Sequence, residues 1–234
     1  MLLLQFSTSP YCRKARLALG YKQLAYTVEN LTPGLHALKL QPLRGTTTVP
    51  VLLPQLAGQP EAIADSTHIF EFLDTYQPDP PLYPSDPALR IETQILEDWL
   101  DESIGTATRF VYYDYRAKEG KQIDPSLVSQ AVIQIVRRQY GINPARVKLA
   151  GDRLSQALAF LEGRWPPTSF LVGDRLTAAD FTAAALLSPL ALLPHYLQSY
   201  PWLFEHIAQV HDHCNTALPP GLEPPLTAQQ DRQL

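Results

Sequence analysis

The sequence has little cysteine, no long apolar run and no excess of positive charge. Its 234 residues include two cysteines, Cys12 and Cys214, and their distant positions match no disulfide or metal-binding pattern. The net charge of −4 predicts no basic surface for nucleic acid. No segment reaches the roughly 20 apolar residues that a membrane span requires, and the first residues lack the pattern of a signal peptide. These absences predict a cytoplasmic protein that binds no metal, nucleic acid or membrane.

Proline is abundant instead, and its densest cluster divides the chain. Residues 78–87 contain five prolines, so they cannot continue a helix and predict a stiff linker. Residues 1–77 before it show strand and helix patterns in turn, whereas residues 88–218 after it show helical patterns only. Residues 219–234 form a tail rich in Pro and Gln, which we expect to pack loosely or not at all.

Short apolar runs and helix signals alternate in the first part, in the order βαβαββα. Strands are predicted at residues 2–6, 24–29, 49–53 and 62–64, and helices at 10–21, at 32 to about 42 and from 66 onward. Gly20 is expected to stop the first helix, and Pro42 with Gly45 the second. The last two strands are expected to form an antiparallel hairpin. This order resembles that of thioredoxin-like domains.

The second part is expected to be an all-helical bundle. The predicted helices are at residues 88–118, 125–140, 144–163, 177–193 and 202–216. Gly141 to Pro144 either kink or separate the second and third of these. The predicted fold class is therefore an α/β domain followed by an all-α domain.

The turn from the first strand into the first helix carries the clearest chemical signal. Ser9 is a favoured helix N-cap, and Pro10 suits the first helical position. A helix start offers free N–H groups and a positive dipole end, which stabilise an anion such as a thiolate. Ser9-Pro10-Tyr11-Cys12 resembles the Cys-Pro-Tyr-Cys motif of glutaredoxins with the first cysteine replaced. The Ser9 hydroxyl is suited to donate to a thiolate that a ligand brings; the alternative is that Ser9 only caps the helix.

Two further sites have a chemical and a structural interpretation. Val49 precedes Pro50 at the start of the third strand, and a cis bond there would turn the Val49 backbone outward to pair with a peptide. An ordinary trans proline at a strand start is the alternative. Asp65 and Ser66 begin the third helix, where they could hold an ammonium group and a carboxylate. A plain N-cap is the alternative there.

Together these sites resemble the cytosolic glutathione S-transferase superfamily over nearly the whole chain. The remaining parts of the resemblance are the Pro-rich linker, the helical second part, a capping box from Thr177 to Asp180 after Gly173-Asp174, and Tyr200-Pro201-Trp202-Leu203. Each motif is weak alone, but five in the right order are strong. The serine at the start of helix one resembles the tau, phi and chi classes.

The resemblance implies roles for individual residues. Ser9 would donate its hydroxyl to the glutathione thiolate, and Val49, before a cis Pro50, would pair its backbone with the cysteinyl unit. Asp65 and Ser66 would hold the γ-glutamyl end. The contact to the glycine carboxylate is not placed, because the loop at residues 41–48 lacks the family's lysine; the candidates are Arg44, Lys39 and His36.

A second-substrate pocket is expected between the two parts of the chain, beside the cluster at residues 109–115. Its candidates are Tyr11, Arg109, Tyr112 and Tyr113; the alternative is that these rings pack in the core or at a subunit interface. Two other roles for the first helical turn are considered. Tyr11 competes with Ser9 as the hydroxyl donor, although its place inside the first helical turn favours the second-substrate pocket. Cys12 competes as a nucleophile like that of cysteine-type members of the superfamily, although the nucleophile of those members lies at the Ser9 position.

The implied activity is conjugation of glutathione, a co-substrate rather than a bound cofactor, to small apolar electrophiles in detoxification. A glutathione-dependent peroxidase or isomerase activity at the same site is the alternative among enzymes. A non-catalytic module that keeps the fold and binds ligands or a partner protein is the alternative outside them. The family resemblance also implies a homodimer.

Overall fold

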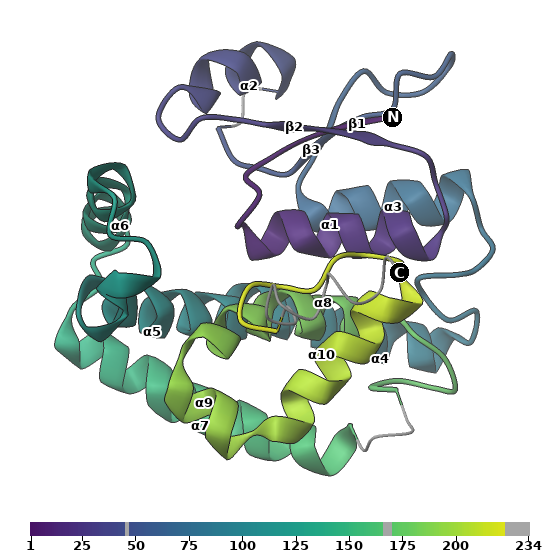
Figure 1. Ribbon diagram of the computed structural model, residues 1–234. Helices are drawn as coiled ribbons and strands as arrows, with labels where there is room; N and C mark the ends of the chain where they lie inside the picture. The colour runs from purple at the N-terminus through teal and green to yellow at the C-terminus, as the bar shows by residue number, and fades with distance from the viewer. Residues whose placement is uncertain (45–46, 166–169, 223–234) are drawn as a thin grey trace, which may run out of the picture.

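A computed structural model describes residues 1–44, 47–165 and 170–222 (Figure 1). The N-terminal part is a four-stranded sheet in the order β2-β1-β3-β4. Strand β1 pairs in parallel with β2 and antiparallel with β3, and β3 forms an antiparallel pair with β4. The elements are β1 (Leu2–Gln5), α1 (Pro10–Tyr21), β2 (Thr27–Asn30), α2 (His36–Arg44), β3 (Val51–Leu53), β4 (Ile63–Ala64) and α3 (Ser66–Tyr76). The predicted βαβαββα order is confirmed.

The two faces of the sheet are buried against different helices. Helices α1 and α3 lie between the sheet and the helical part of the chain, and α2 lies on the opposite side (Figure 1). Successive strand residues point to opposite faces. Leu3 and Leu52 therefore join the large core that continues into the helical part, whereas Leu4 and Val51 join a small cluster with Leu40 of α2.

The rest of the chain is helical, as the sequence predicts. Its elements are α4 (Pro87–Asp98), a π-helix (Trp99–Ile104), α5 (Gly105–Ala117), α6 (Leu127–Gln139), α7 (Pro144–Arg164), α8 (Ala178–Leu187), α9 (Pro194–Ser199) and α10 (Pro201–His213), with 3-10 turns at Glu119–Ile123 and Ser188–Leu192. Every residue of α8 is buried, and α8 packs against α1, α4 and α10. The core is therefore continuous between the two parts.

The start of α8 is fixed by one buried carboxylate. Asp180 accepts hydrogen bonds from the backbone N–H of Leu171 at 2.8 Å and from the N–H and hydroxyl of Thr177 at 2.9 and 2.8 Å. Burial raises the pKa of Asp180 to about 6, although these hydrogen bonds favour its charged form. The capping box expected from Thr177 and Asp180 is confirmed.

Several predicted boundaries are wrong. The second strand begins at Thr27 rather than at residue 24, and Pro42 lies inside α2 instead of ending it. The predicted helix at 88–118 contains the π-helix, and the one at 177–193 changes to a 3-10 turn after Leu187. The chain separates α6 from α7 between Tyr140 and Asn143.

Gly20 does not stop α1, which continues to Tyr21. A Cβ atom on Gly20 would lie 2.1 Å from the carbonyl oxygen of Cys214, so glycine is required there because the chain after α10 approaches α1 closely. At the tail, Pro219 is buried and Leu222 packs against the core, so loose packing is wrong for residues 219–222. Residues 223–234 lie outside the described residues. Over the described ranges, no helix has the length and apolar character needed to cross a membrane.

Candidate functional site

The first turn of α1 presents the Ser9 hydroxyl. Ser9 is the N-cap, Pro10 follows at the first helical position, and Ser9 Oγ accepts a hydrogen bond from the Cys12 N–H at 3.4 Å. That bond uses an oxygen lone pair, and the Ser9 side chain also hydrogen-bonds to the Cys12 thiol, a weak acceptor that a ligand thiolate would replace. The Ser9 side chain is half-buried. An anion in front of this turn would meet both the proton and the positive end of the helix.

Tyr11, the competing hydroxyl, is already engaged. It donates to the backbone carbonyl of Asp101 in the π-helix at 2.8 Å. Burial raises the pKa of Tyr11 to about 12, although the nearby charge of Arg109 acts in the opposite direction. A Cβ on Gly105 would lie 2.9 Å from the Tyr11 hydroxyl, so the absence of a side chain at Gly105 permits this contact. Because its proton is directed at a main-chain carbonyl, Tyr11 is less able than Ser9 to donate a hydrogen bond to a thiolate.

Cys12 lies on the buried side of the same helix. It is fully buried, and burial raises the pKa of its thiol. Reactive cysteines have a lowered pKa and some exposure. The geometry therefore favours a packing role for Cys12 over a nucleophilic one.

The peptide bond between Val49 and Pro50 is cis. Pro50 is buried and Val49 is half-buried immediately before β3. At the end of β4, Asp65 caps α3 by accepting hydrogen bonds from the N–H groups of Thr67 at 2.8 Å and His68 at 3.4 Å. Asp65 has a φ of 78°, a strained conformation for a residue with a side chain, and such strain clusters at functional sites. Its neighbour Ser66 is 3% exposed.

A cavity of about 350 Å³ opens between the start of α3 and the helix α4 with the π-helix that follows it. This volume falls within the range of small-molecule sites. Tyr11, Asp65 and Ser66 all line it, whereas Ser9 and Val49 do not. The other lining residues are mostly polar and acidic: Thr67, His68, Glu71, Tyr83, Gln94, Glu97, Asp98, Asp101 and Glu102.

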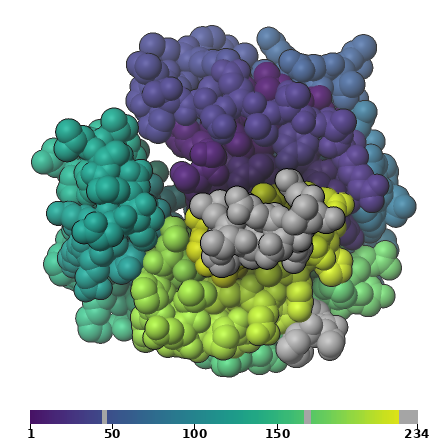
Figure 2. All heavy atoms as spheres, in the orientation of Figure 1, coloured from purple at the N-terminus to yellow at the C-terminus, as the bar shows by residue number. Residues whose placement is uncertain are grey.

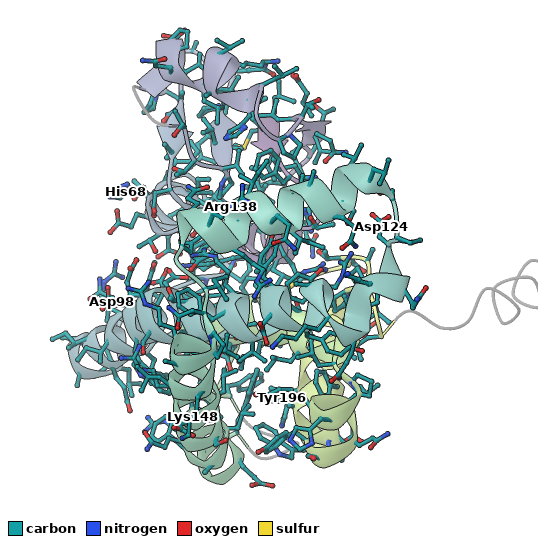
Figure 3. The ribbon with its side chains drawn as sticks, turned by 90° about the vertical axis from the view of Figure 1, so that its left-hand side faces the viewer. His68, Asp98, Asp124, Arg138, Lys148 and Tyr196 are labelled. Atoms are coloured by element: carbon teal, nitrogen blue, oxygen red, sulfur yellow. The ribbon has the colours of Figure 1, made fainter. Side chains whose placement is uncertain are left out.

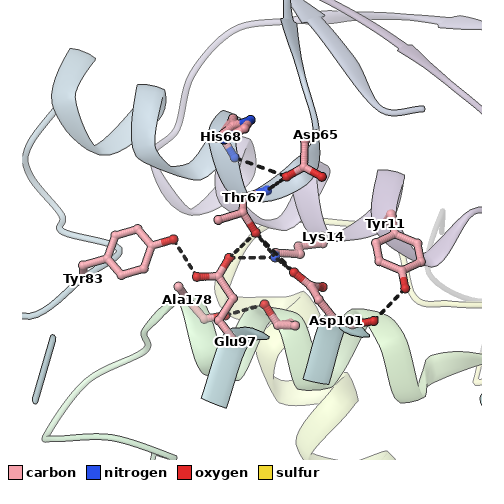
Figure 4. A network of polar contacts seen from close by, with 10 residues as sticks. Tyr11, Lys14, Asp65, Thr67, His68, Tyr83, Glu97, Asp101 and Ala178 are labelled. Atoms are coloured by element: carbon pink, nitrogen blue, oxygen red, sulfur yellow. Dashed lines mark hydrogen bonds and ion pairs between the residues drawn. The ribbon is translucent and has the colours of Figure 1, made fainter. Parts of the chain in front are cut away.

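A buried ion network forms one wall of this cavity (Figure 4). Lys14 of α1 is fully buried, and its Nζ lies 2.7 Å from Glu97 Oε1 and 2.5 Å from Asp101 Oδ2. It also donates to the Thr67 hydroxyl at 3.1 Å, and Tyr83 donates to Glu97 at 2.6 Å. Burial raises the pKa of Asp101, and Lys14 opposes that shift. The network joins α1, the start of α3 and α4.

This network is the part of the site that we did not predict from the sequence. Its signal is the spacing within α1, because Lys14 precedes the buried Leu17 and Ala18 by three and four residues and so lies on the same face. A lysine at such a position requires buried carboxylates. Their identity has no local signal, since Glu97 and Asp101 are more than eighty residues away.

The predicted second-substrate residues lie near one another on α5. The Arg109 guanidinium carbon lies 5.5 Å from the ring centre of Tyr11 and 4.5 Å from that of Tyr140 at the end of α6. The rings of Tyr112 and Tyr113 meet edge to face at 5.2 Å. The structure thus brings Tyr11 and Arg109 together across the two parts of the chain.

The three residues considered as contacts for the glycine carboxylate of glutathione differ in their surroundings. Lys39 is ion-paired with Glu29. His36 packs edge to face against Phe6, with ring centres 4.9 Å apart. The side chain of Arg44 lies outside the described residues. For metal ions, the described part of the chain holds no group of three or more His, Cys, Asp or Glu side chains suited to coordination.

Comparisons with known proteins agree with this architecture. Residues 3–81 match the family model of the glutathione S-transferase N-terminal domain, and residues 134–209 match that of the C-terminal domain. FtsZ-localized protein A from Caulobacter vibrioides is 25% identical over 197 residues, which cover 84% of this chain and 78% of that protein. A probable glutathione S-transferase, parA, from Nicotiana tabacum is 29% identical over 157 residues, 66% of each chain.

A solved structure shows the same fold. It is a glutathione S-transferase from Methylobacterium radiotolerans in complex with glutathione sulfonate, with a TM-score of 0.69 and 22% identity over 93% of this chain and 94% of that one. The two domain models, in order, cover most of the chain, and the thioredoxin-like sheet followed by a helical bundle is the arrangement seen here. The chain belongs to the glutathione S-transferase superfamily.

Proposed function

We propose that this protein is a serine-type glutathione transferase that joins the glutathione thiolate to small electrophiles. One observation carries the proposal: Ser9 caps α1 with its oxygen occupied by the Cys12 N–H, while the competing Tyr11 hydroxyl donates to Asp101. Of these two hydroxyl groups, Ser9 has the weaker competing acceptor, the Cys12 thiol, whereas Tyr11 donates to a main-chain carbonyl. Family membership supports glutathione as the ligand.

In the proposed reaction, glutathione loses its thiol proton on binding and the sulfur attacks the electrophile. A carbon–sulfur bond forms, the bond to the leaving group breaks, and the leaving group departs with its electron pair. The Ser9 hydroxyl and the N-terminus of α1 stabilise the thiolate, and a shared site brings the reactants together. Val49 would hold the cysteinyl backbone, and Asp65 and Ser66 the glutamyl end.

The electrophile would bind beside Tyr11 and Arg109, with Tyr112 and Tyr113 behind them. Their proximity supports a site between the two parts of the chain. A peroxidase or isomerase reaction would use the same thiolate. We further propose a homodimer in the cytoplasm, acting in detoxification, as the family resemblance implies.

A non-catalytic role is the second candidate, and one comparison favours it. FtsZ-localized protein A, which matches 84% of this chain, is named for where it is found rather than for a reaction. A binding module would keep the fold without turnover. Ser9, Val49-Pro50 and Asp65-Ser66 argue for catalysis when they occur together, because a scaffold has no need of all three.

The test combines binding to immobilised glutathione with turnover of an aryl halide, an isothiocyanate and an organic hydroperoxide. Ser9→Ala should lower kcat about 10- to 100-fold, from the loss of one hydrogen bond to a charged group, and change glutathione affinity much less. The matched control is Ser155→Ala, at an exposed position on α7. Full activity in Ser9→Ala would refute the thiolate role, and binding without any turnover would favour the non-catalytic candidate.

A further inference from the structure

Two arginines on α5 are held by aromatic and hydroxyl groups instead of carboxylates. Within the described residues, neither Arg109 nor Arg116 has a carboxylate within ion-pair distance. They are seven residues apart, so they share one face of the helix. Both charges act to lower the pKa of Tyr113, which places that ring near both.

Arg109 lies beside two tyrosine rings. The rings of Tyr11 and Tyr140 lie 5.5 and 4.5 Å from its central carbon, and the side chain is half-buried. The Arg109 side chain hydrogen-bonds to the Tyr11 hydroxyl. A guanidinium has five N–H donors in one plane, so this contact leaves others that could bind an anion.

Arg116 adds a second positive charge from a more buried position. It is 7% exposed, donates to the Tyr112 hydroxyl at 2.8 Å and to Ser129 at 3.1 Å, and its buried Nε atom has no partner. Asp124 interacts with this charge only from an exposed position and beyond ion-pair distance, so Arg116 keeps a positive potential around it. The nearby Asp114 does not cancel it, because Asp114 pairs with Lys118 and Arg137.

Carboxylates near Tyr11 do not neutralise Arg109 either. Asp101 is bound to Lys14, and Glu102 is exposed. After burial, Arg109 is the strongest influence on the pKa of Tyr11, ahead of Asp101 and Glu102. The positive charge therefore lies on the side of the Tyr11 ring that faces Arg109 and Tyr140, whereas the cavity that Tyr11 also lines is acidic.

The position of this group fits a substrate site. Tyr11 lies two residues after Ser9 in the first turn of α1, and Arg109 lies against its ring. Figure 2 shows the surface hollowed between α6 and the N-terminal part of the chain, and Tyr140, at the end of α6, is 38% exposed. The aromatic ring of a ligand could stack on Tyr11 or Tyr140 while its acidic substituent accepts hydrogen bonds from the guanidinium of Arg109.

We propose that Arg109, supported by the charge of Arg116, selects aromatic electrophiles that carry an anionic group such as a carboxylate. The proposal rests on the proposed function for its reaction, but the anion preference concerns binding and can be measured without turnover. The purely apolar electrophile expected from the sequence is thereby replaced by an aromatic anion. The bonding change is unaltered: for an aryl chloride, a carbon–sulfur bond forms and chloride leaves.

The first experiment compares 4-chloro-3,5-dinitrobenzoate with the neutral 4-chloro-3,5-dinitrobenzamide as electrophiles. Arg109→Met should lower kcat/KM for the benzoate at least tenfold, and at least five times more than for the benzamide, because the loss of a charge-assisted hydrogen bond affects only the anion. Arg109→Lys should recover part of the preference. The control is Arg138→Met, which removes an exposed positive charge on α6 (Figure 3). Equal losses for both electrophiles would overturn the proposal.

The second experiment measures calorimetric binding of 4-nitrobenzoate and 4-nitrobenzamide without glutathione, in the wild type and both methionine variants. Weaker binding of the benzoate in Arg109→Met, but not in Arg138→Met, supports the anion preference. This holds even if no electrophile is turned over; that outcome would refute only the proposed transferase function. Turnover with no benzoate preference, or no benzoate binding at millimolar concentration, would overturn the anion preference. Circular dichroism confirms that each variant is folded.

Discussion

The buried Lys14 provides the sharpest test of how the two parts of the chain are joined. Lys14→Met keeps the length of the side chain and removes its charge, which leaves the carboxylates of Glu97 and Asp101 buried without their cation. Removing one partner of a buried ion pair costs about 3–5 kcal/mol. For a protein of this size, 1 kcal/mol shifts Tm by roughly 2–4 °C, so we expect Tm to fall by about 6–20 °C.

The loss should depend on pH with a defined sign. Burial raises the pKa of Asp101, and removing Lys14 should raise it further. A carboxyl group whose folded pKa lies above its unfolded value favours folding at low pH, and this contribution is lost as pH rises through the folded pKa. The Lys14→Met variant should therefore be most destabilised at pH 8, and the difference from the wild type should shrink toward pH 5.

Thermal unfolding at pH 5 and pH 8 measures both effects. Lys148→Met is the matched control, because Lys148 pairs with Asp152 on the surface and its side chain is 77% exposed, so its loss should hardly change Tm. The triple variant Lys14→Met, Glu97→Gln, Asp101→Asn removes all three charges and should recover part of the lost stability. A fall in Tm no larger for Lys14→Met than for Lys148→Met, or one of equal size at both pH values, would refute a stabilising role for the buried ion pairs of Lys14.

Two further predictions concern single buried groups. Ser66→Ala should raise the Kd of glutathione about tenfold, because it removes one hydrogen bond to a charged group. Calorimetry measures the Kd, with Thr75→Ala at an exposed position on α3 as the control. An unchanged Kd would remove Ser66 from the site. His211 is fully buried, and burial lowers its pKa to about 4. A depressed histidine pKa means that this group binds more protons in the unfolded chain between pH 4 and 6.5. The contribution of His211 to stability should therefore fall by roughly 2 kcal/mol from pH 7 to pH 5, while the raised pKa of Asp180 acts in the opposite direction. Urea denaturation of His211→Gln should show a smaller fall, and an identical pH dependence would exclude His211 as the cause.

Local signals predicted the elements of the fold well where the pattern was strong. Ser9, Asp65 and Thr177 were identified as helix starts because their side chains satisfy backbone groups within three residues. Errors arose where a contact distant in sequence sets the structure. Gly20 resembles a helix stop, yet it is glycine because the carbonyl of Cys214 approaches α1.

In the candidate site too, local motifs could be predicted and contacts distant in sequence could not. The residues of the first helical turn and of the third helix start have local motifs, and Tyr11, Asp65 and Ser66 line one cavity. The contacts that fix these residues have no such motif, because they form only when α4 and α5 pack on α1 and α3. Thr67, which follows Ser66, bonds to Lys14, and Tyr11 bonds to Asp101, which also binds Lys14. A change in this packing should therefore move the first turn of α1 and the start of α3 together, although no residue of the network belongs to a recognisable motif.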